Sequence, residues 1–137
     1  MTVLRFTAAA AILVMALAAC ATPPSCPAPA KSTTQVDLYF GRDIAGKAEV
    51  SEAQWARFVD EEVTPRFPAG LTVTDARGQY RDTQTGKIDR ERSKRLTVLV
   101  DDLAASRPKL EAIAEAYKRR FQQQSVLRVE GLVCAAF

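Results

Sequence analysis

The chain has 137 residues, of which 47% are hydrophobic and 26% are charged, and its formal net charge is +3. This composition is typical of one globular domain and excludes a disordered polymer, a collagen and a protein with several membrane spans. The chain contains no histidine, which excludes Ser-His-Asp and Cys-His nucleophile systems, His-ligated haem and most catalytic zinc sites.

The first 19 residues have the layout of an export signal. Arg5 supplies a positive charge, and the 13 residues from Phe6 to Ala18 are uncharged and mostly apolar. Such a run is too short to cross a bilayer as a stable helix and suits the core of a signal peptide. The tetrapeptide Leu17-Ala18-Ala19-Cys20 at its end resembles the bacterial lipobox, whose cysteine becomes the first mature residue and carries lipid. The alternative is an ordinary signal peptide followed by a coincidental cysteine.

A lipidated Cys20 predicts a stable membrane anchor, because two or more acyl chains hold a protein on a bilayer. Residue 21 is Ala, whereas an aspartate there often marks inner-membrane retention in Gram-negative bacteria. We therefore expect an outer-membrane protein facing the periplasm, which would meet no nucleic acid. Residues 20–34 are rich in Pro, Ala, Ser and Thr and predict a tether, followed by a single domain over residues 35–137.

A strand and a helix open the predicted domain. Apolar and polar residues alternate over residues 36–40, which predicts a half-buried strand. Ser51 and Gln54 have the spacing of a capping box and predict the start of a helix. Because a proline follows Thr64 and disfavours helical backbone at that residue, the helix is expected to end there.

Three further strands and a second helix follow. Strands are predicted over residues 71–81 and 96–100, joined by a polar turn, with Gly78 marking a bulge in the first of them. Apolar residues at helical spacing from Leu110 to Phe121 predict the second helix. The last strand is expected over residues 126–137, interrupted at its glycine.

The order β-α-β-β-α-β predicts an α+β fold, a ferredoxin-like sandwich with a four-stranded antiparallel sheet and two helices on one face. Right-handed crossovers place the first and third strands in the centre, where we expect them to be parallel, with the fourth strand antiparallel beside the first. Another α+β arrangement of the same elements is the alternative.

The sheet face without helices is a candidate contact surface for a protein partner or a second copy of the chain. From alternation, we expect Leu127 and Val129 of the last strand to point toward the helices. The side chains expected on the outer face are Asp37 and Tyr39 of the first strand and Val126, Arg128 and Glu130 of the last.

Four stretches of the domain resemble the sequence pattern of a known family: residues 39–46, 50–82, 91–100 and 116–129. The most specific parts are PRFPAGLTV at residues 65–73 and QSVLRV at residues 124–129. In these stretches the chain resembles domain of unknown function 3574, a set of bacterial lipoproteins, over essentially residues 35–137. Tyr80 stands where the family pattern has Trp, and Gln124 where it has Glu. The resemblance implies the fold and the address, and no activity.

Two cysteines remain once Cys20 is assigned to lipid. Cys26 lies shortly before the first strand and Cys134 near the end of the last, and these strands are predicted antiparallel neighbours. The export signal implies an oxidising compartment, so we predict a Cys26–Cys134 disulfide. The alternative is two independent thiols. Two thiolates without histidine would leave a metal ion under-coordinated, so we expect neither a metal nor another cofactor.

Six polar or aromatic residues form the candidate ligand or partner site: Tyr39, Arg42, Arg66, Glu91, Ser93 and Arg128. Arginines could line an anion-binding cleft as bidentate donors, and the alternative is buried ion pairs and loop caps. Strand alternation places Ser93 and Lys94 on opposite faces, which argues against a Ser-Lys pair, and we assign no catalytic residue.

Seven basic residues stand against three acidic ones between Arg77 and Arg95. This basic hairpin could hold an anionic ligand, a lipid headgroup or a partner, and charges that protect an edge strand explain it as well. Three functions remain for the protein. We favour a lipid-tethered binding module. The second is a binder of small anionic molecules or a hydrolase-like enzyme, with a cleft walled by Arg66, Glu91 and Arg128. The third is a purely structural lipoprotein.

Overall fold

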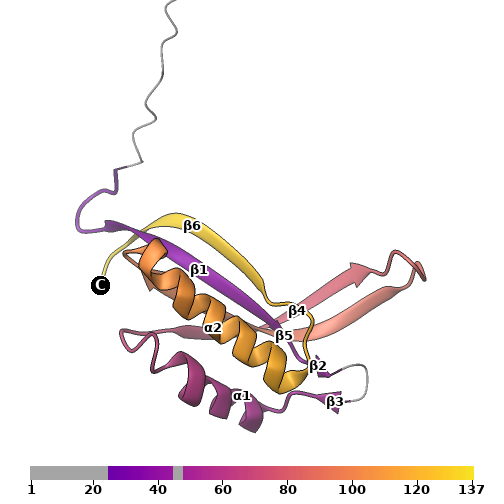
Figure 1. Cartoon of the computed structure of the whole chain (residues 1–137). Coiled ribbons are helices and arrows are strands. Elements are labelled where there is room, and N and C mark those ends of the chain that lie inside the picture. Colours follow the sequence, from indigo (N-terminus) through magenta and orange to yellow (C-terminus); the bar gives the residue numbers. More distant parts are fainter. Residues whose placement is uncertain (1–24, 45–47) are drawn as a thin grey trace, which may run out of the picture.

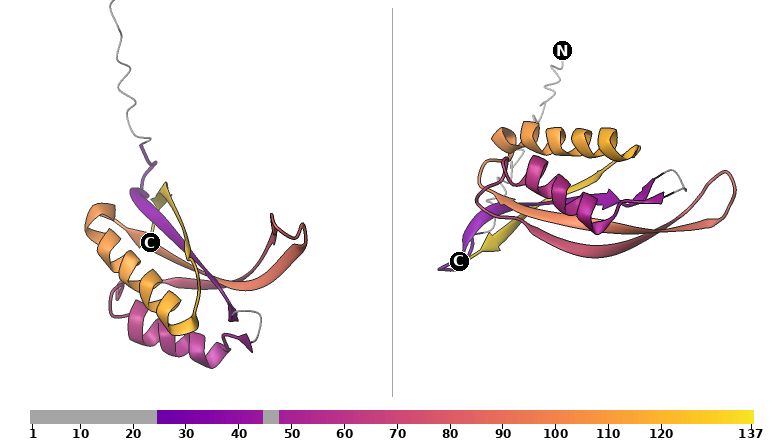
Figure 2. Two further views of the ribbon diagram at one scale, coloured as in Figure 1. Left: turned by 45° about the vertical axis from the view of Figure 1, so that its right-hand side comes forward. Right: turned by 90° about the horizontal axis from the view of Figure 1, so that it is seen from below.

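The computed structural model describes residues 25–44 and 48–137; the predicted signal peptide and lipidation site lie outside them. Along the chain follow β1 (Lys31–Gly41), β2 (Asp43–Ile44), β3 (Ala48–Glu49), α1 (Glu52–Phe58), the π-helix η1 (Val59–Val63), β4 (Thr72–Arg81), β5 (Ile88–Val100), α2 (Leu103–Phe121) and β6 (Leu127–Ala135). β4, β5, β1 and β6 form one sheet in that order, and α1 and α2 cover the same face of it (Figures 1 and 2). This is the predicted ferredoxin-like fold.

The two central strands run in opposite directions, so the predicted parallel pairing is wrong. β1 and β5 are antiparallel, with Val36 opposite Val98 and Gly41 opposite Ser93. The crossover through α1 connects β1 to the edge strand β4 and makes these two strands parallel. Because β5 returns from β4 in a hairpin, it must run against both. β6 lies antiparallel beside β1, as predicted.

Several strands are longer or more regular than the sequence indicated. β1 begins at Lys31, inside the segment predicted as a tether, and β5 begins at Ile88 instead of residue 96. The bulge at Gly78 and the interruption at Gly131 are absent, because β4 and β6 pair with their neighbours continuously through both glycines. At Gly78 and Gly131 the space that a side chain would occupy is open, and the backbone pairing continues past both residues.

The predicted capping box opens the first helix. Ser51 Oγ accepts a hydrogen bond from the Gln54 backbone N–H at 3.2 Å, and Gln54 Oε1 accepts one from the Ser51 N–H at 2.9 Å. After α1 the helix widens into η1, where the Thr64 N–H bonds to the Val59 carbonyl five residues back. The wide turn keeps Val63 fully buried. The helix ends at the predicted place, but Thr64 itself has helical backbone angles (φ −53°, ψ −43°), so the expectation of non-helical backbone there is wrong.

Aromatic rings form the centre of the core between the sheet and the helices. The Phe40 ring lies 4.7 Å from Tyr117, 5.2 Å from Trp55 and 5.8 Å from Phe58, measured between centroids. Tyr117 is fully buried, and its hydroxyl donates a hydrogen bond to the Gly41 carbonyl at 2.8 Å. Burial raises the pKa of the Tyr117 phenol, so the hydroxyl stays protonated and keeps this bond.

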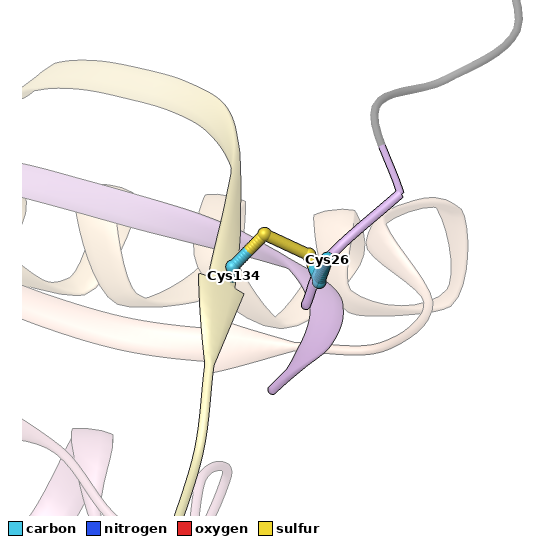
Figure 3. Close-up of a disulfide and its surroundings, with 2 residues drawn as sticks. All are labelled: Cys26 and Cys134. Carbon is cyan, nitrogen blue, oxygen red and sulfur yellow. A yellow bond between two sulfur atoms is a disulfide. The ribbon is translucent and has the colours of Figure 1, made fainter. Parts of the chain in front are cut away.

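A disulfide joins Cys26 to Cys134, as predicted (Figure 3). The two Cα atoms are 5.5 Å apart although 108 positions separate them in the sequence. Cys134 lies opposite Ser32 near the end of β6. The bond therefore fastens the segment before β1 to the edge strand of the sheet.

Candidate functional site

The sheet face without helices is the main candidate site (Figure 2). β1 contributes Tyr39 and, nearer its centre, Asp37, on the side opposite the buried core residues, as predicted. β6 contributes Leu127 opposite Tyr39 and Val129 opposite Asp37. Directly opposite residues of an antiparallel pair project to the same side of a sheet, so both β6 side chains lie on the uncovered face.

The prediction that Val126, Arg128 and Glu130 face away from the helices is therefore wrong. Val126 is partly buried against the core. Glu130 Oε2 lies 3.4 Å from Arg107 Nη2, and Arg128 Nη1 lies 4.0 Å from Glu111 Oε1, both partners belonging to α2. Because α2 offers charged partners along β6, Arg128 and Glu130 lie on the helix side of this strand, and Leu127 and Val129 remain outside.

Asp37 is the polar centre of the uncovered face. Its side chain accepts hydrogen bonds from Arg95 Nη2 at 2.7 Å, Thr97 Oγ1 at 2.5 Å and Gln35 Nε2 at 3.0 Å, and the residue is only 6% exposed. Burial acts to raise the pKa of the Asp37 carboxyl, but the three hydrogen bonds and the Arg95 charge outweigh it, and the pKa is lowered. The Arg95 guanidinium also lies over the Tyr39 ring, 5.9 Å from its centroid. This centre is thus charged, yet internally neutralised.

Exposed apolar side chains surround this centre and form what we call the apolar rim: Leu99, Leu127 and Val129. Their exposed fractions are 39%, 59% and 46%. Leu99 belongs to β5 and lies opposite Gln35, and the other two belong to β6. Apolar side chains around a satisfied polar centre are typical of a modest protein interface.

Arg42 lies away from this face, in an ion cluster that pairs two buried cations, Arg42 and Lys94, with exposed carboxylates. It is 3% exposed, and it donates to the Val50 carbonyl at 2.8 Å through Nε and to Glu52 Oε1 at 2.6 Å through Nη1. Lys94, 5% exposed, binds Glu52 Oε2 at 2.7 Å and Asp75 Oδ1 at 2.6 Å. Hydrogen bonds from Lys94 lower the pKa of both carboxyls. The cluster ties the start of α1 to β4 and β5, which is a structural role.

The remaining predicted site residues contact different partners. Arg66 Nη1 lies 3.0 Å from Glu62 Oε2, one helical turn back. The Glu91 carboxylate lies over Gly41, where a Cβ atom would clash with its oxygens, and Ser93 is half-buried opposite Gly41. Arg128 lies under α2. No three of the predicted site residues therefore line one cleft.

Two shallow grooves border α2. A groove of about 440 Å³ lies between α1 and the end of α2, where Arg120 pairs with Glu61 at 2.8 Å and with Glu62 at 3.3 Å. A second groove, of about 380 Å³, lies between α2 and β6 and includes Arg128. Arg120 in the first groove and Arg128 in the second are already paired within the molecule. In the described part of the chain, no cluster of three or more metal-ligating side chains occurs, and no helix is long and apolar enough to cross a membrane.

Fold and surface thus define a small ferredoxin-like α+β protein with one open sheet face. Residues 35–137 match the family model described as protein of unknown function, DUF3574. The chain therefore belongs to this family, which its sequence motifs already indicated. No curated protein matches the chain.

Among solved structures, the chain is similar to a phage SAM lyase in complex with S-methyl-5'-thioadenosine, with a TM-score of 0.58 and 13% identity over 77% of this chain and 90% of that one. The apo state of a phage SAM lyase gives a TM-score of 0.53 and 16% identity with the same coverage. CutA from Synechococcus elongatus, complexed with Bis-Tris, gives 0.49 and 11% over 78% and 87% of the two chains. At these identities the lyase similarity shows a shared fold and no shared activity.

Proposed function

We propose that the protein is an exported, lipid-anchored module of the bacterial cell envelope that binds another protein surface through its uncovered sheet face. The observation that carries the proposal is the apolar rim of Leu99, Leu127 and Val129 around the neutralised Asp37–Arg95 centre. Because the charges of the centre are satisfied internally, the expected partner surface is one that presents apolar side chains and no matching net charge.

The address in this proposal has two sources. The Leu17–Cys20 tetrapeptide follows the apolar run of an export signal. The Cys26–Cys134 disulfide supports an oxidising compartment, where such bonds persist. The alternative, an anion-binding or hydrolase-like cleft of Arg66, Glu91 and Arg128, has no comparable geometric support, because the three side chains contact different partners.

Anchoring is tested by Cys20→Ser in the native host. We expect the variant to lose the acyl mass on its N-terminal peptide and to leave the detergent-extracted membrane fraction as a soluble or unprocessed form. Cys26→Ser is the matched control, because it removes a cysteine six positions further on and should keep the lipid. An N-terminal peptide without acyl mass in the wild type, together with unchanged fractionation of the variant, would refute the anchor.

Binding through the rim is tested by a photoreactive amino acid at position 127. The matched control carries it at position 132, because Leu127 and Leu132 are exposed to 59% and 62% on the same strand but project to opposite sides of it. We expect cross-linked species from position 127 in intact cells, at twice the mass of the protein for a second copy or at another defined mass for a different partner. Val129→Lys should abolish them. Equal yields from positions 127 and 132 would count against the rim as a binding surface.

A further inference from the structure

The β4–β5 hairpin continues past the end of β1 as a two-stranded arm, visible on the right of Figure 1. β1 pairs with β5 only as far as Ser93, with one further backbone hydrogen bond from Arg42 to Arg92. We call residues 77–92 the arm. Its two strands pair with each other through Arg77 opposite Arg92 at the base and Arg81 opposite Ile88 near the tip.

The register sorts the charges of the arm onto two faces. Opposite residues and every second residue along a strand share a face. One face, which we call the arginine face, consists of Arg77, Gln79, Arg81, Ile88, Arg90 and Arg92. The other consists of Gly78, Tyr80, Asp89 and Glu91. All four arginines of the paired strands therefore lie on one face and both acidic residues on the other.

The arginine face is not neutralised within the chain. Arg77 and Arg92 lie directly opposite each other, an arrangement in which like charges destabilise an antiparallel pair. Of the four arginines, Arg92 alone forms an ion pair among the described residues, with Glu49 Oε1 at 3.4 Å. Arg77 and Arg90 are exposed. Protecting a strand edge from aggregation, the other use of exposed charge, needs no such separation of signs onto two faces.

We propose that the arginine face binds the phosphate headgroups of anionic phospholipids at the membrane surface. The proposal rests on the lipid anchor of the proposed function, which would hold the domain beside a bilayer. Guanidinium groups form bidentate hydrogen bonds with phosphate, and neighbouring positions on the face lie about 5–8 Å apart, so adjacent arginines engage separate phosphate groups. Ile88, 45% exposed at the outer end of the same face, adds an apolar contact of the kind that basic membrane-surface segments use.

The chain length between anchor and domain favours this partner. Cys26 is fixed to the sheet by the disulfide, and the six peptide bonds between Cys20 and Cys26 reach at most about 20 Å. One end of the sheet is thus held close to the bilayer. The arm projects from the other end, beyond the Gly41 end of β1 (Figure 1). The arginine face continues the helix-covered side of the sheet, because Arg92 lies two positions from Lys94 and Lys94 contacts Glu52 of α1. With the long axis of the sheet along the surface and this side toward the lipid, anchor and arm contact the same membrane.

The experiment measures the reactivity of individual arginines toward phenylglyoxal. The purified lipidated protein is reconstituted in vesicles of phosphatidylcholine alone or of equal parts phosphatidylcholine and phosphatidylglycerol, and modification is followed by peptide mass spectrometry. We expect severalfold slower modification of Arg77, Arg81 and Arg90 in the anionic vesicles only, with full reactivity restored by high salt. Arg95 lies on the opposite face of the sheet, beside Tyr39, and is the internal control whose rate should not change.

A charge-matched pair of variants completes the test. Arg77→Gln with Arg90→Gln should remove the protection of Arg81, whereas Arg57→Gln with Arg119→Gln, which removes the same charge, should preserve it. Equal rates in both kinds of vesicle, or equal protection of Arg95 on the opposite face, would overturn the proposal. Protection by an acidic polypeptide but not by phosphatidylglycerol would also overturn it in favour of a protein ligand. Failure to enter phosphatidylcholine vesicles would instead refute the anchor, so the two failures are distinguishable.

Discussion

Replacing Asp37 by Asn tests whether the polar centre of the uncovered face stabilises the fold. Asparagine keeps one acceptor oxygen but replaces the other with an amide group, which then faces the donors of Arg95 and Gln35 at the positions where Oδ2 accepts at 2.7 and 3.0 Å. Hydrogen bonds to charged groups contribute about 1.5–3 kcal/mol each. Because the Arg95 side chain is 37% exposed, water can solvate it in the variant, and we expect a net loss of about 2 kcal/mol.

Urea unfolding at neutral pH measures this loss, with Asp60→Asn, an exposed position of η1, as the control that should change little. The acid dependence provides the decisive comparison. The pKa of Asp37 lies below its ordinary value of 3.8, so its contribution to stability is complete above that value and disappears as the pH falls through the lowered pKa of the folded state. The stability curves of wild type and Asp37→Asn should therefore converge in acid. A gap that stays constant from neutral pH to well below 3.8 would refute the reasoning.

Three further changes probe the packing and the covalent bond. Tyr117→Phe removes the buried hydrogen bond to Gly41 and should lower the free energy of unfolding in urea by about 1–2 kcal/mol; an unchanged value would contradict the role of the hydroxyl. Gly41→Ala displaces the Glu91 carboxylate and should cost about 1 kcal/mol in the wild type but almost nothing in Glu91→Ala; equal costs in both would be the negative result. Replacing Cys26 and Cys134 by Ser opens a loop whose ends are 108 positions apart and should lower the free energy of unfolding by up to about 4–5 kcal/mol. Reduction of the wild type should lower the melting temperature by the same amount. An unchanged melting temperature would show that the disulfide does not stabilise the fold.

The elements that could be predicted from the sequence are those with a local signal. The capping box at Ser51 and Gln54 depends on two side chains and one turn of backbone. The disulfide was predictable because the βαββαβ order makes β1 and β6 neighbours, and this needs only topology. Strand direction in the centre was predictable as well, because the predicted order already joins β1 through α1 to β4 and the β4–β5 hairpin then makes β5 antiparallel to both. The predicted parallel pairing did not follow from that order.

The orientation of β6 and the arginine face could not be predicted, because both depend on register. β6 carries apolar residues on both sides, with Leu127 and Val129 on one and Leu132 on the other, so alternation alone does not choose the buried side. The pairing with β1 and the charged side chains of α2 decide it. The arm is similar: its basic residues can be counted in the sequence, but only the pairing of β4 with β5 places Arg77 opposite Arg92.

The position of the disulfide also determines how the domain transmits mechanical force. Nearly all of the described chain lies between Cys26 and Cys134, so tension applied outside these two residues passes through the sulfur–sulfur bond and leaves the sheet without load. A second case is a force that pulls on the chain before Cys26 while a partner molecule holds the sheet. This force enters β1 and β6 together, at the ends that lie side by side (Figure 3). The strands are then pulled along their length, and their hydrogen bonds share the load instead of opening one after another from the N-terminus.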